Sequence, residues 1–218
     1  MFKSLNFKVI LFGFIFTFFS SFGQSFFLGL FNSSIRDALS ITHGQFGSIY
    51  ASATLLSSFI LVWIGKKIDD FNILKFASYV IALLAISCFL FSKISSVVFL
   101  FLSIFLMRLS GQGLMSHTAT TTISRFFEKT RGRALSITWL GLSLAEFILP
   151  LLIIFLLTFV DWRNIWIVIS IFVIVVLPII TFSLVKNIKL DSRETVSLNE
   201  VKTKEIKQWK RSEVLKDY

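Results

Sequence analysis

Six long apolar segments take up most of this 218-residue chain. A helix that crosses a bilayer needs about 20 mostly apolar residues. The segments that meet this length are Lys8 to Phe31, Gly44 to Ile64, Leu74 to Ser92, Ser95 to Ile123, Ala134 to Val160 and Ile165 to Val185. The sequence therefore predicts an all-α, multi-pass membrane protein. A bundle of six transmembrane helices, residues 8–185, follows a cytoplasmic N-terminus, residues 1–7, and precedes a charged cytoplasmic tail, residues 186–218.

The composition excludes a soluble domain and a nucleic-acid-binding protein. Hydrophobic residues make up 55% of the chain, and 27 residues are Phe, which is too apolar for a wet surface. The net charge of +10 comes from Lys and Arg residues that lie between the apolar segments and in the tail. The lipid bilayer is therefore the expected partner of these charges.

The positions of the basic residues predict the orientation of the bundle. An even number of spans places both termini on one side of the membrane. Lys and Arg gather before the first span, after the second and fourth spans, and in the tail, whereas the opposite loops hold Arg36, Lys93 and Arg163. Basic loops stay in the cytoplasm, so both termini are expected to be cytoplasmic, in the plasma (cytoplasmic) membrane.

Two ionisable residues lie inside predicted spans, Arg108 in the fourth and Glu146 in the fifth. At about 1.5 Å per residue, Arg108 lies ~20 Å and Glu146 ~18 Å deep, close to the bilayer midplane. Such residues line a cavity, pair with each other or carry protons, because charge is costly in hydrocarbon. Three roles stay open: a structural ion pair, an anion site at Arg108, or a protonatable carboxylate at Glu146 that couples transport to proton flow.

Helical periodicity assigns polar residues to faces. The first span carries a polar stripe, which either lines a wet path or packs with its hydroxyls bonded to backbone carbonyls. Its members are Gly13, Thr17, Ser20, Ser21 and Gln24. Gln24 favours the wet path. On the fourth span, Gly111 and Gln112 share an expected cavity face with Arg108, and Ser110 and Gly113 lie on a separate packing stripe. Another packing stripe is expected on the second span, at Gly47, Ala51, Thr54 and Ser58.

A family resemblance lies in the loop after the second span, which reads GKKIDDFNILK over residues 65–75. It resembles the cytoplasmic signature GxLaDrxGrk of the major facilitator superfamily, whose first glycine and aspartate are matched by Gly65 and Asp69. Asn72 replaces the second glycine of the signature, and Lys75 falls one place beyond its basic pair. The match is partial but lies on the expected loop.

Two later segments resemble the same superfamily. Gly111 and Gly113 follow Arg108 as glycines follow a membrane-embedded arginine in the fourth helix of that family. The loop RFFEKTRGRA, residues 125–134, is similar to the RG-x-A loop of the monocarboxylate-porter-like and oxalate/formate-like branches. The fifth span departs from the antiporter pattern GxxxGPxxGG, so exchange is not inferred. Together the resemblances imply the N-terminal six-helix half of the superfamily fold.

By this resemblance the cytoplasmic loops act as gates. Asp69 is expected to pair with Arg131 or Arg133, and Glu128 with Lys75, so that the inner side is closed when the transporter faces outward. The alternative is that these residues are only topology charges and helix caps.

The function implied by the resemblance is one half of a secondary active transporter that rocks against a missing C-terminal half around a midplane site. The cationic position and the branch favour a small organic anion, a monocarboxylate, moved by symport with a proton. The alternative is a self-contained six-helix protein that works as a homodimeric porter or channel. The expected substrate and coupling residues are Arg108, Gln112, Glu146 and Gln24. One cysteine and two histidines predict neither an enzyme nor a metal or cofactor site.

Overall fold

Helices make up the regular structure of the described chain, with no strand among the described residues. The computed structural model describes residues 4–69 and 72–186, and the side chains at positions 4, 5 and 69 lie outside that description. The elements in chain order are α1 (Ser4–Phe19), η1 (Ser20–Gly23), α2 (Ser25–Gly29), α3 (Asn32–Leu39), α4 (His43–Lys66), η2 (Lys67–Asp69), α5 (Ile73–Ser92), α6 (Val97–Met107), η3 (Arg108–Met115), α7 (Ser116–Phe126), α8 (Arg131–Leu157) and α9 (Trp162–Val185).

Six helical stretches are long and apolar enough to cross a membrane, which confirms the predicted all-α six-helix bundle. They are Asn6–Gly29, His43–Lys66, Ile73–Ser92, Val97–Phe126, Arg131–Leu157 and Trp162–Val185. The predicted spans overlap all of these stretches. Local composition alone is sufficient for this prediction, because a spanning segment must satisfy its own backbone and be apolar throughout.

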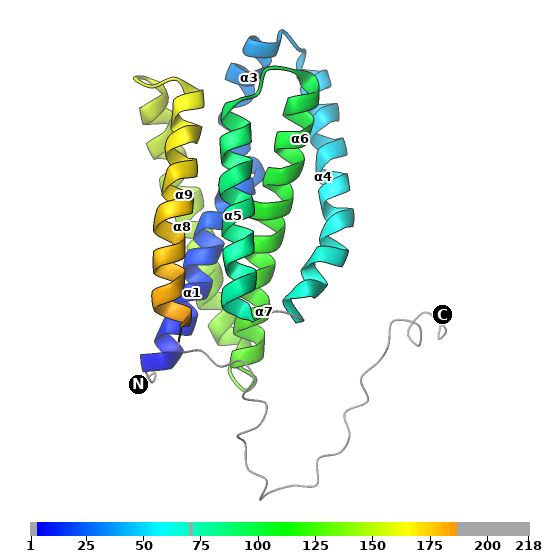
Figure 1. Ribbon diagram of the computed structural model, residues 1–218. Helices are drawn as coiled ribbons and strands as arrows, with labels where there is room; N and C mark the ends of the chain where they lie inside the picture. The colour runs from blue at the N-terminus through cyan, green and yellow to red at the C-terminus, as the bar shows by residue number, and fades with distance from the viewer. Residues whose placement is uncertain (1–3, 70–71, 187–218) are drawn as a thin grey trace, which may run out of the picture.

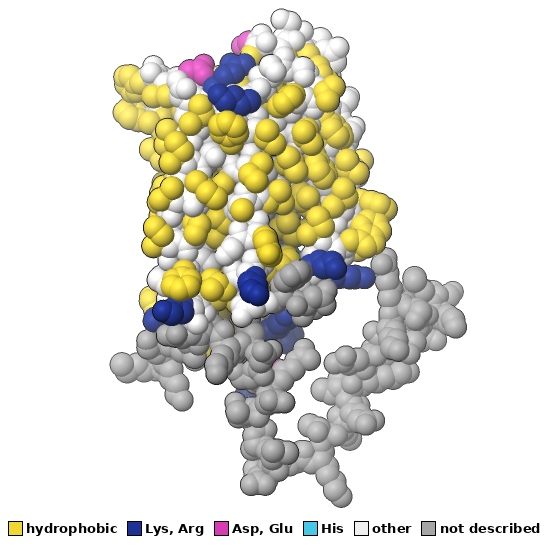
Figure 2. All heavy atoms as spheres, in the orientation of Figure 1, with side chains coloured by type: hydrophobic (Ala, Val, Ile, Leu, Met, Phe, Trp, Pro, Cys, Tyr) yellow, Lys and Arg dark blue, Asp and Glu magenta, His cyan; other side chains and the backbone are white. Residues whose placement is uncertain are grey.

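The spans run side by side and reverse direction at two ends (Figure 1). The start of α1 lies at one end with the end of α4, the start of α5 and the α7–α8 loop, and α3 lies at the other. Figure 2 shows hydrophobic side chains over the middle of the visible face and Lys and Arg side chains towards both ends. This distribution fits a bundle that spans a bilayer.

Two helix pairs are tied together by hydroxyl groups. Thr17 of α1 donates to the carbonyl oxygen of Thr138 in α8 at 2.6 Å, and Ser170 of α9 donates to that of Ala85 in α5 at 2.8 Å. Close backbone approach and interhelical hydrogen bonds are the usual sources of helix association in lipid, where apolar burial drives little. α1 therefore packs along α8, and α5 along α9.

Two of the spans are not continuous α-helices. The first is interrupted at η1, after which Gln24 is extended with φ −81° and ψ 154°. The fourth contains a π-helix, η3, between α6 and α7. The predicted first span, Lys8 to Phe31, is therefore confirmed as one membrane-length stretch, Asn6–Gly29, but it is interrupted at η1, which packs against η3.

The small-residue stripe expected to pack on the second span is uncovered within the described bundle. Gly47, Ala51 and Ser58 are exposed, and Thr54 is half-buried. A Cβ at Gly47 would meet no atom within 4 Å among the described residues. The stripe therefore does not mediate packing inside these six spans.

Candidate functional site

Arg108 lies at the start of the π-helix and is only 7% exposed. Its Nη1 donates to the carbonyl oxygen of Gly23 at 3.0 Å. Gly23 precedes the first hydrogen bond of α2, from Leu28 N to Gln24 O, so its carbonyl lies at the break in the first span. Arg108 thus supplies a donor to a carbonyl that a continuous helix would bond internally.

Tyr50 and Ser25 complete the surroundings of the guanidinium. Arg108 Nη1 also donates to Ser25 Oγ at 3.3 Å, and the hydroxyl of Tyr50 donates to the same oxygen at 2.8 Å. The guanidinium carbon lies 5.4 Å from the centre of the Tyr50 ring, within the range of a cation–π interaction. These contacts join α2, α4 and η3, and none of them neutralises the charge of Arg108.

A small hollow opens beside Arg108, between α4 and η3. Its volume is about 120 Å³. The residues that line it are Ser57, Ser58, Leu61, Arg108, Gln112 and Gly113. The structure thus brings together Arg108 and Gln112, the two residues expected on one cavity face.

Gly111 and Gly113 exchange their expected environments. Gly113 was assigned to a packing stripe but lines the hollow. Gly111 instead packs on the broken first span, where a Cβ on it would lie 2.6 Å from the backbone nitrogen of Gly23. The reason is the π-helix, whose i→i+5 bonding changes the angle between successive residues, so an assignment made at 100° per residue fails there.

The polar stripe of the first span mostly serves packing. Thr17 and Ser20 are fully buried, and Ser20 Oγ donates to the carbonyl oxygen of Thr17 at 2.7 Å. Gln24 is half-buried and is not among the residues that line the hollow. The packing interpretation therefore holds for Thr17 and Ser20, whereas Ser21 Oγ is buried without a hydrogen-bond partner among the described residues. A substrate role for Gln24 stays a prediction.

Glu146 lies apart from Arg108. It is exposed on α8, and α8 packs along α1 rather than along η3. Among the described side chains no salt bridge joins Glu146 to Arg108, whose polar contacts are Gly23 and Ser25. The structural ion pair is therefore wrong in this arrangement: the depths of the two residues match, but the first span lies between their helices. A proton-carrying role for Glu146 stays a prediction.

The first glycine of the loop signature has a defined contact. The carbonyl oxygen of Gly65 lies 3.0 Å from Nε2 of His117 in α7, and because a carbonyl only accepts, Nε2 carries the hydrogen. A Cβ on Gly65 would lie 3.3 Å from the same nitrogen. This contact holds the end of α4 against α7 and leaves little room for a side chain at Gly65.

The structure describes one side of the first expected gate pair, the arginines at 131 and 133. The side chain of Asp69 lies outside the described residues, so its pairing with Arg131 or Arg133 stays a prediction. Arg131 donates from Nε to the carbonyl oxygen of Ser124 at 3.1 Å, and Arg133 is exposed.

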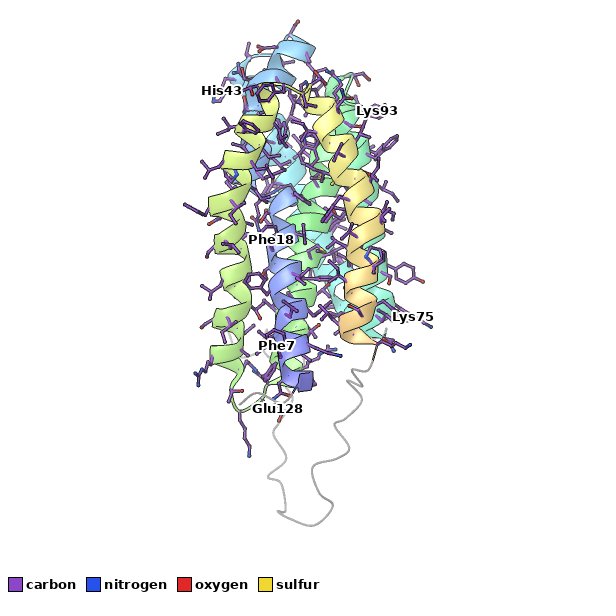
Figure 3. All side chains as sticks on the ribbon, turned by 90° about the vertical axis from the view of Figure 1, so that its left-hand side faces the viewer. Phe7, Phe18, His43, Lys75, Lys93 and Glu128 are labelled. Carbon is purple, nitrogen blue, oxygen red and sulfur yellow. The ribbon has the colours of Figure 1, made fainter. Side chains whose placement is uncertain are left out.

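The second expected gate pair is not formed. Glu128 and Lys75 are both exposed, and no ion pair between these two described side chains is present. Figure 3 shows them on different sides of the same end of the bundle. The expected contact between them is therefore absent from this conformation, because α5 starts on one side of that end and the α7–α8 loop lies on the other.

Sequence reasoning missed Tyr50, Ser57 and Ser25. Tyr50, Ser57 and Leu61 recur on α4 at helical spacing, so they share the face that meets η3. That spacing was a usable signal for Tyr50 and Ser57. No local signal marks Ser25, because its position depends on the break at Gln24.

Comparison with known protein families agrees with the architecture of the bundle. The family model described as Major Facilitator Superfamily matches residues 13–216. Among curated proteins, none matches this sequence. The family match covers most of the chain and includes the broken first span, the π-helix and both basic loops. The chain belongs to the Major Facilitator Superfamily and is a multi-pass membrane transporter of that family.

Proposed function

We propose that this chain is the N-terminal half of a secondary transporter that moves a small organic anion by alternating access. The observation that carries the proposal is the buried Arg108 beside a hollow between α4 and η3. A guanidinium stays protonated under physiological conditions. Its contacts to Gly23, Ser25 and Tyr50 are with groups that carry no formal negative charge. The hollow therefore favours an anionic solute.

The hollow, with a volume of about 120 Å³, is one side of the proposed site. The facing half of the site would come from a C-terminal half, around which this bundle rocks. In the same proposal Gly65, Asp69 and the arginines at 131 and 133 belong to the cytoplasmic gate.

Proton coupling is assigned to Glu146. Its carboxylate is exposed on a helix face with apolar neighbours, among them Phe147 at 71% exposure. A carboxylate at membrane depth must be protonated, face water or meet a partner group. We therefore assign to Glu146 the proton that accompanies the anion.

Assays of the reconstituted chain with a panel of solutes test the proposal. Binding and uptake of acetate, lactate, glucose and choline are measured in proteoliposomes with an inward proton gradient. Saturable binding of the carboxylates alone is the expected result. Absence of carboxylate binding, or equal binding of glucose, would contradict the proposal.

A homodimeric porter or channel is the second candidate, supported by the uncovered faces of α4 and α8. Leu55 of α4 is 72% exposed, and the small residues at 47 and 51 lie on the same exposed side. Close approach of small residues is a common basis of helix pairing in membranes. Cysteine crosslinking of Ala51→Cys, in a Cys88→Ser background, distinguishes the candidates. Efficient dimer formation together with solute uptake by the chain alone supports the homodimer. Solute binding without uptake supports the half.

A further inference from the structure

Two basic side chains come together at the α3 end of the bundle, Lys93 directly after α5 and Arg163 in the first turn of α9. Arg163 donates from Nη2 to the carbonyl oxygen of Ile94 at 3.2 Å, which places its guanidinium beside the backbone that carries Lys93. Figure 3 shows Lys93 at the end opposite Lys75 and Glu128. In the predicted orientation the loops at this end hold three Lys or Arg residues, and two of the three meet here.

Each of the two cations lies on an aromatic ring. Lys93 Nζ is 5.6 Å from the centre of the Phe89 ring, and Cζ of Arg163 is 4.3 Å from the centre of the Trp162 ring. Trp162 is buried, whereas Phe89 is exposed on the surface of α5. Basic side chains that lie along apolar groups and reach water with their charged ends are typical of the bilayer interface. The two cations are therefore held at the boundary between the apolar surface and water.

The charges of these two side chains are not neutralised within the described part of the chain. Neither cation forms a salt bridge there, and Asp161, the acidic residue closest in sequence, caps α9 by accepting from the backbone N–H of Arg163 at 2.8 Å. Because Arg163 uses Nη2 for Ile94, Nε and Nη1 have no partner among the described residues. Free guanidinium donors beside an ammonium group suit the oxygens of a phosphate.

The surface between the two cations and the middle of the bundle is apolar. Phe89 and Ile86, three residues apart on α5, are both exposed, as is Ile171, two turns after Arg163 on α9. α5 and α9 pack along each other, so these side chains belong to one continuous face. Figure 2 shows hydrophobic side chains directly beneath Lys and Arg side chains at this end. An amphiphile with an anionic head and hydrocarbon chains matches both parts of this face.

We propose that this face of α5 and α9 binds an anionic phospholipid, whose phosphate lies between Lys93 and Arg163 and whose acyl chains cover the apolar side chains. Phosphatidylglycerol, with one net negative charge, satisfies the two cations, whereas phosphatidylcholine adds a quaternary ammonium that they repel. In the predicted orientation the lipid belongs to the outer leaflet. The surface is separate from the hollow at Arg108, so this proposal goes beyond anion transport and does not rest on it.

Fluorescence quenching measures which lipid covers this face. A fluorophore is attached to Ile171→Cys in a Cys88→Ser background, and the chain is reconstituted in liposomes in which either phosphatidylglycerol or phosphatidylcholine carries bromine on its acyl chains. At equal mole fractions, brominated phosphatidylglycerol is expected to quench as a lipid bound about tenfold more tightly than brominated phosphatidylcholine. High salt is expected to reduce this preference, because the attraction between exposed charges is screened.

Lys93→Gln is the decisive variant, because Lys93 is exposed and its removal leaves the packing of α5 intact. It is expected to reduce the preference to about twofold, since one of two basic residues is lost. Arg163→Gln is expected to do the same. Because it also loses the bond to Ile94, Arg163→Lys accompanies it and is expected to keep most of the preference.

Arg36→Gln is the matched control for this experiment. It removes the same charge at the same end of the bundle, but Arg36 belongs to α3, which packs on α4, and its Nε donates to Asn32 Oδ1 at 2.7 Å. The preference for phosphatidylglycerol is expected to stay at the wild-type value in this variant.

Three results would overturn the lipid site. The first is equal quenching by the two brominated lipids in the wild type. The second is a preference that stays unchanged in both Lys93→Gln and Arg163→Gln, because the anionic lipid would then be held by other basic residues. The third is an equal loss of preference in Arg36→Gln. Carboxylate binding at Arg108 is a separate measurement, so failure of the lipid site and failure of the proposed function are distinguishable.

Discussion

Nη1 of Arg108 donates to the carbonyl oxygen of Gly23 at 3.0 Å, which joins the π-helix of the fourth span to the break in the first. Each irregular segment exposes backbone that a regular helix would bond internally. Because the two breaks lie against each other, the arginine stabilises one of them and also lines the hollow. The same side chain therefore has both a structural and a functional role.

Close contact between Gly23 and Gly111 makes their junction intolerant of side chains. Gly111→Val is expected to lower the free energy of unfolding by about 1–3 kcal/mol, because the added atoms overlap the Gly23 backbone. Thermal unfolding in detergent measures the loss. Gly44→Ala is the control, since a Cβ there meets no described atom within 4 Å. Equal unfolding temperatures for Gly111→Val and the wild type would contradict this packing.

Tyr50 contributes to the Arg108 site in two separable ways. Tyr50→Phe removes the hydrogen bond to Ser25 but keeps the ring, whereas Tyr50→Leu also removes the cation–π contact. The second variant is expected to lose a further ~1–2 kcal/mol of stability, because the cation is largely desolvated. Thermal unfolding of the two variants under identical conditions measures the difference. If both variants melt at one temperature, the ring does not stabilise Arg108.

Glu146→Gln removes a protonatable group and keeps the size of the side chain. The proton uptake that accompanies carboxylate binding by the reconstituted chain, followed with a pH indicator in weakly buffered solution, is expected to disappear, because the neutral amide cannot gain or lose a proton. Equilibrium binding of the anion should be little changed, since Glu146 lies away from Arg108 in this structure. Proton uptake at the wild-type level would remove Glu146 from the coupling mechanism.

Asp69→Asn tests the cytoplasmic gate. Loss of the carboxylate is expected to shift the chain towards conformations open to the cytoplasm, because the cytoplasmic gate would lose the ion pair predicted between Asp69 and Arg131 or Arg133. The rate at which a membrane-impermeant maleimide labels Ser58→Cys, in a Cys88→Ser background, measures the opening from each side. Asp37→Asn, in α3 at the opposite end of the bundle, is the matched control. Identical labelling rates in the two Asn variants would contradict the gate.

The spans were predictable from sequence because each depends on its own composition. Their boundaries follow from the length of apolar segments, and the position of Arg108 inside the fourth span follows from counting residues. The lateral arrangement was not predictable in the same way. Arg108 and Glu146 have similar depths, but depth does not say which helix lies between theirs, and α1 does.

The irregular segments were the other limit of sequence reasoning. A helical wheel at 100° per residue placed Gly111 on the cavity face and Gly113 on a packing face, and the π-helix moved Gly113 to the hollow and Gly111 to the Gly23 contact. That π-helix packs against a break in a different span. Periodicity within one span carries no information about such a contact. Arg108 and Gln112 could be predicted to share the site because both are polar residues in an apolar segment.

Equilibrium binding of radiolabelled lactate to the reconstituted wild type and to Arg108→Gln tests the anion site most directly. Both are measured at a temperature well below either unfolding transition, with Lys93→Gln, an exposed basic residue of the opposite loop, as the charge control. Arg108→Gln is expected to weaken binding by about tenfold or more, because it removes the cation that meets the carboxylate, and Lys93→Gln is expected to bind as the wild type does. Wild-type affinity in folded Arg108→Gln would contradict an anion site at Arg108.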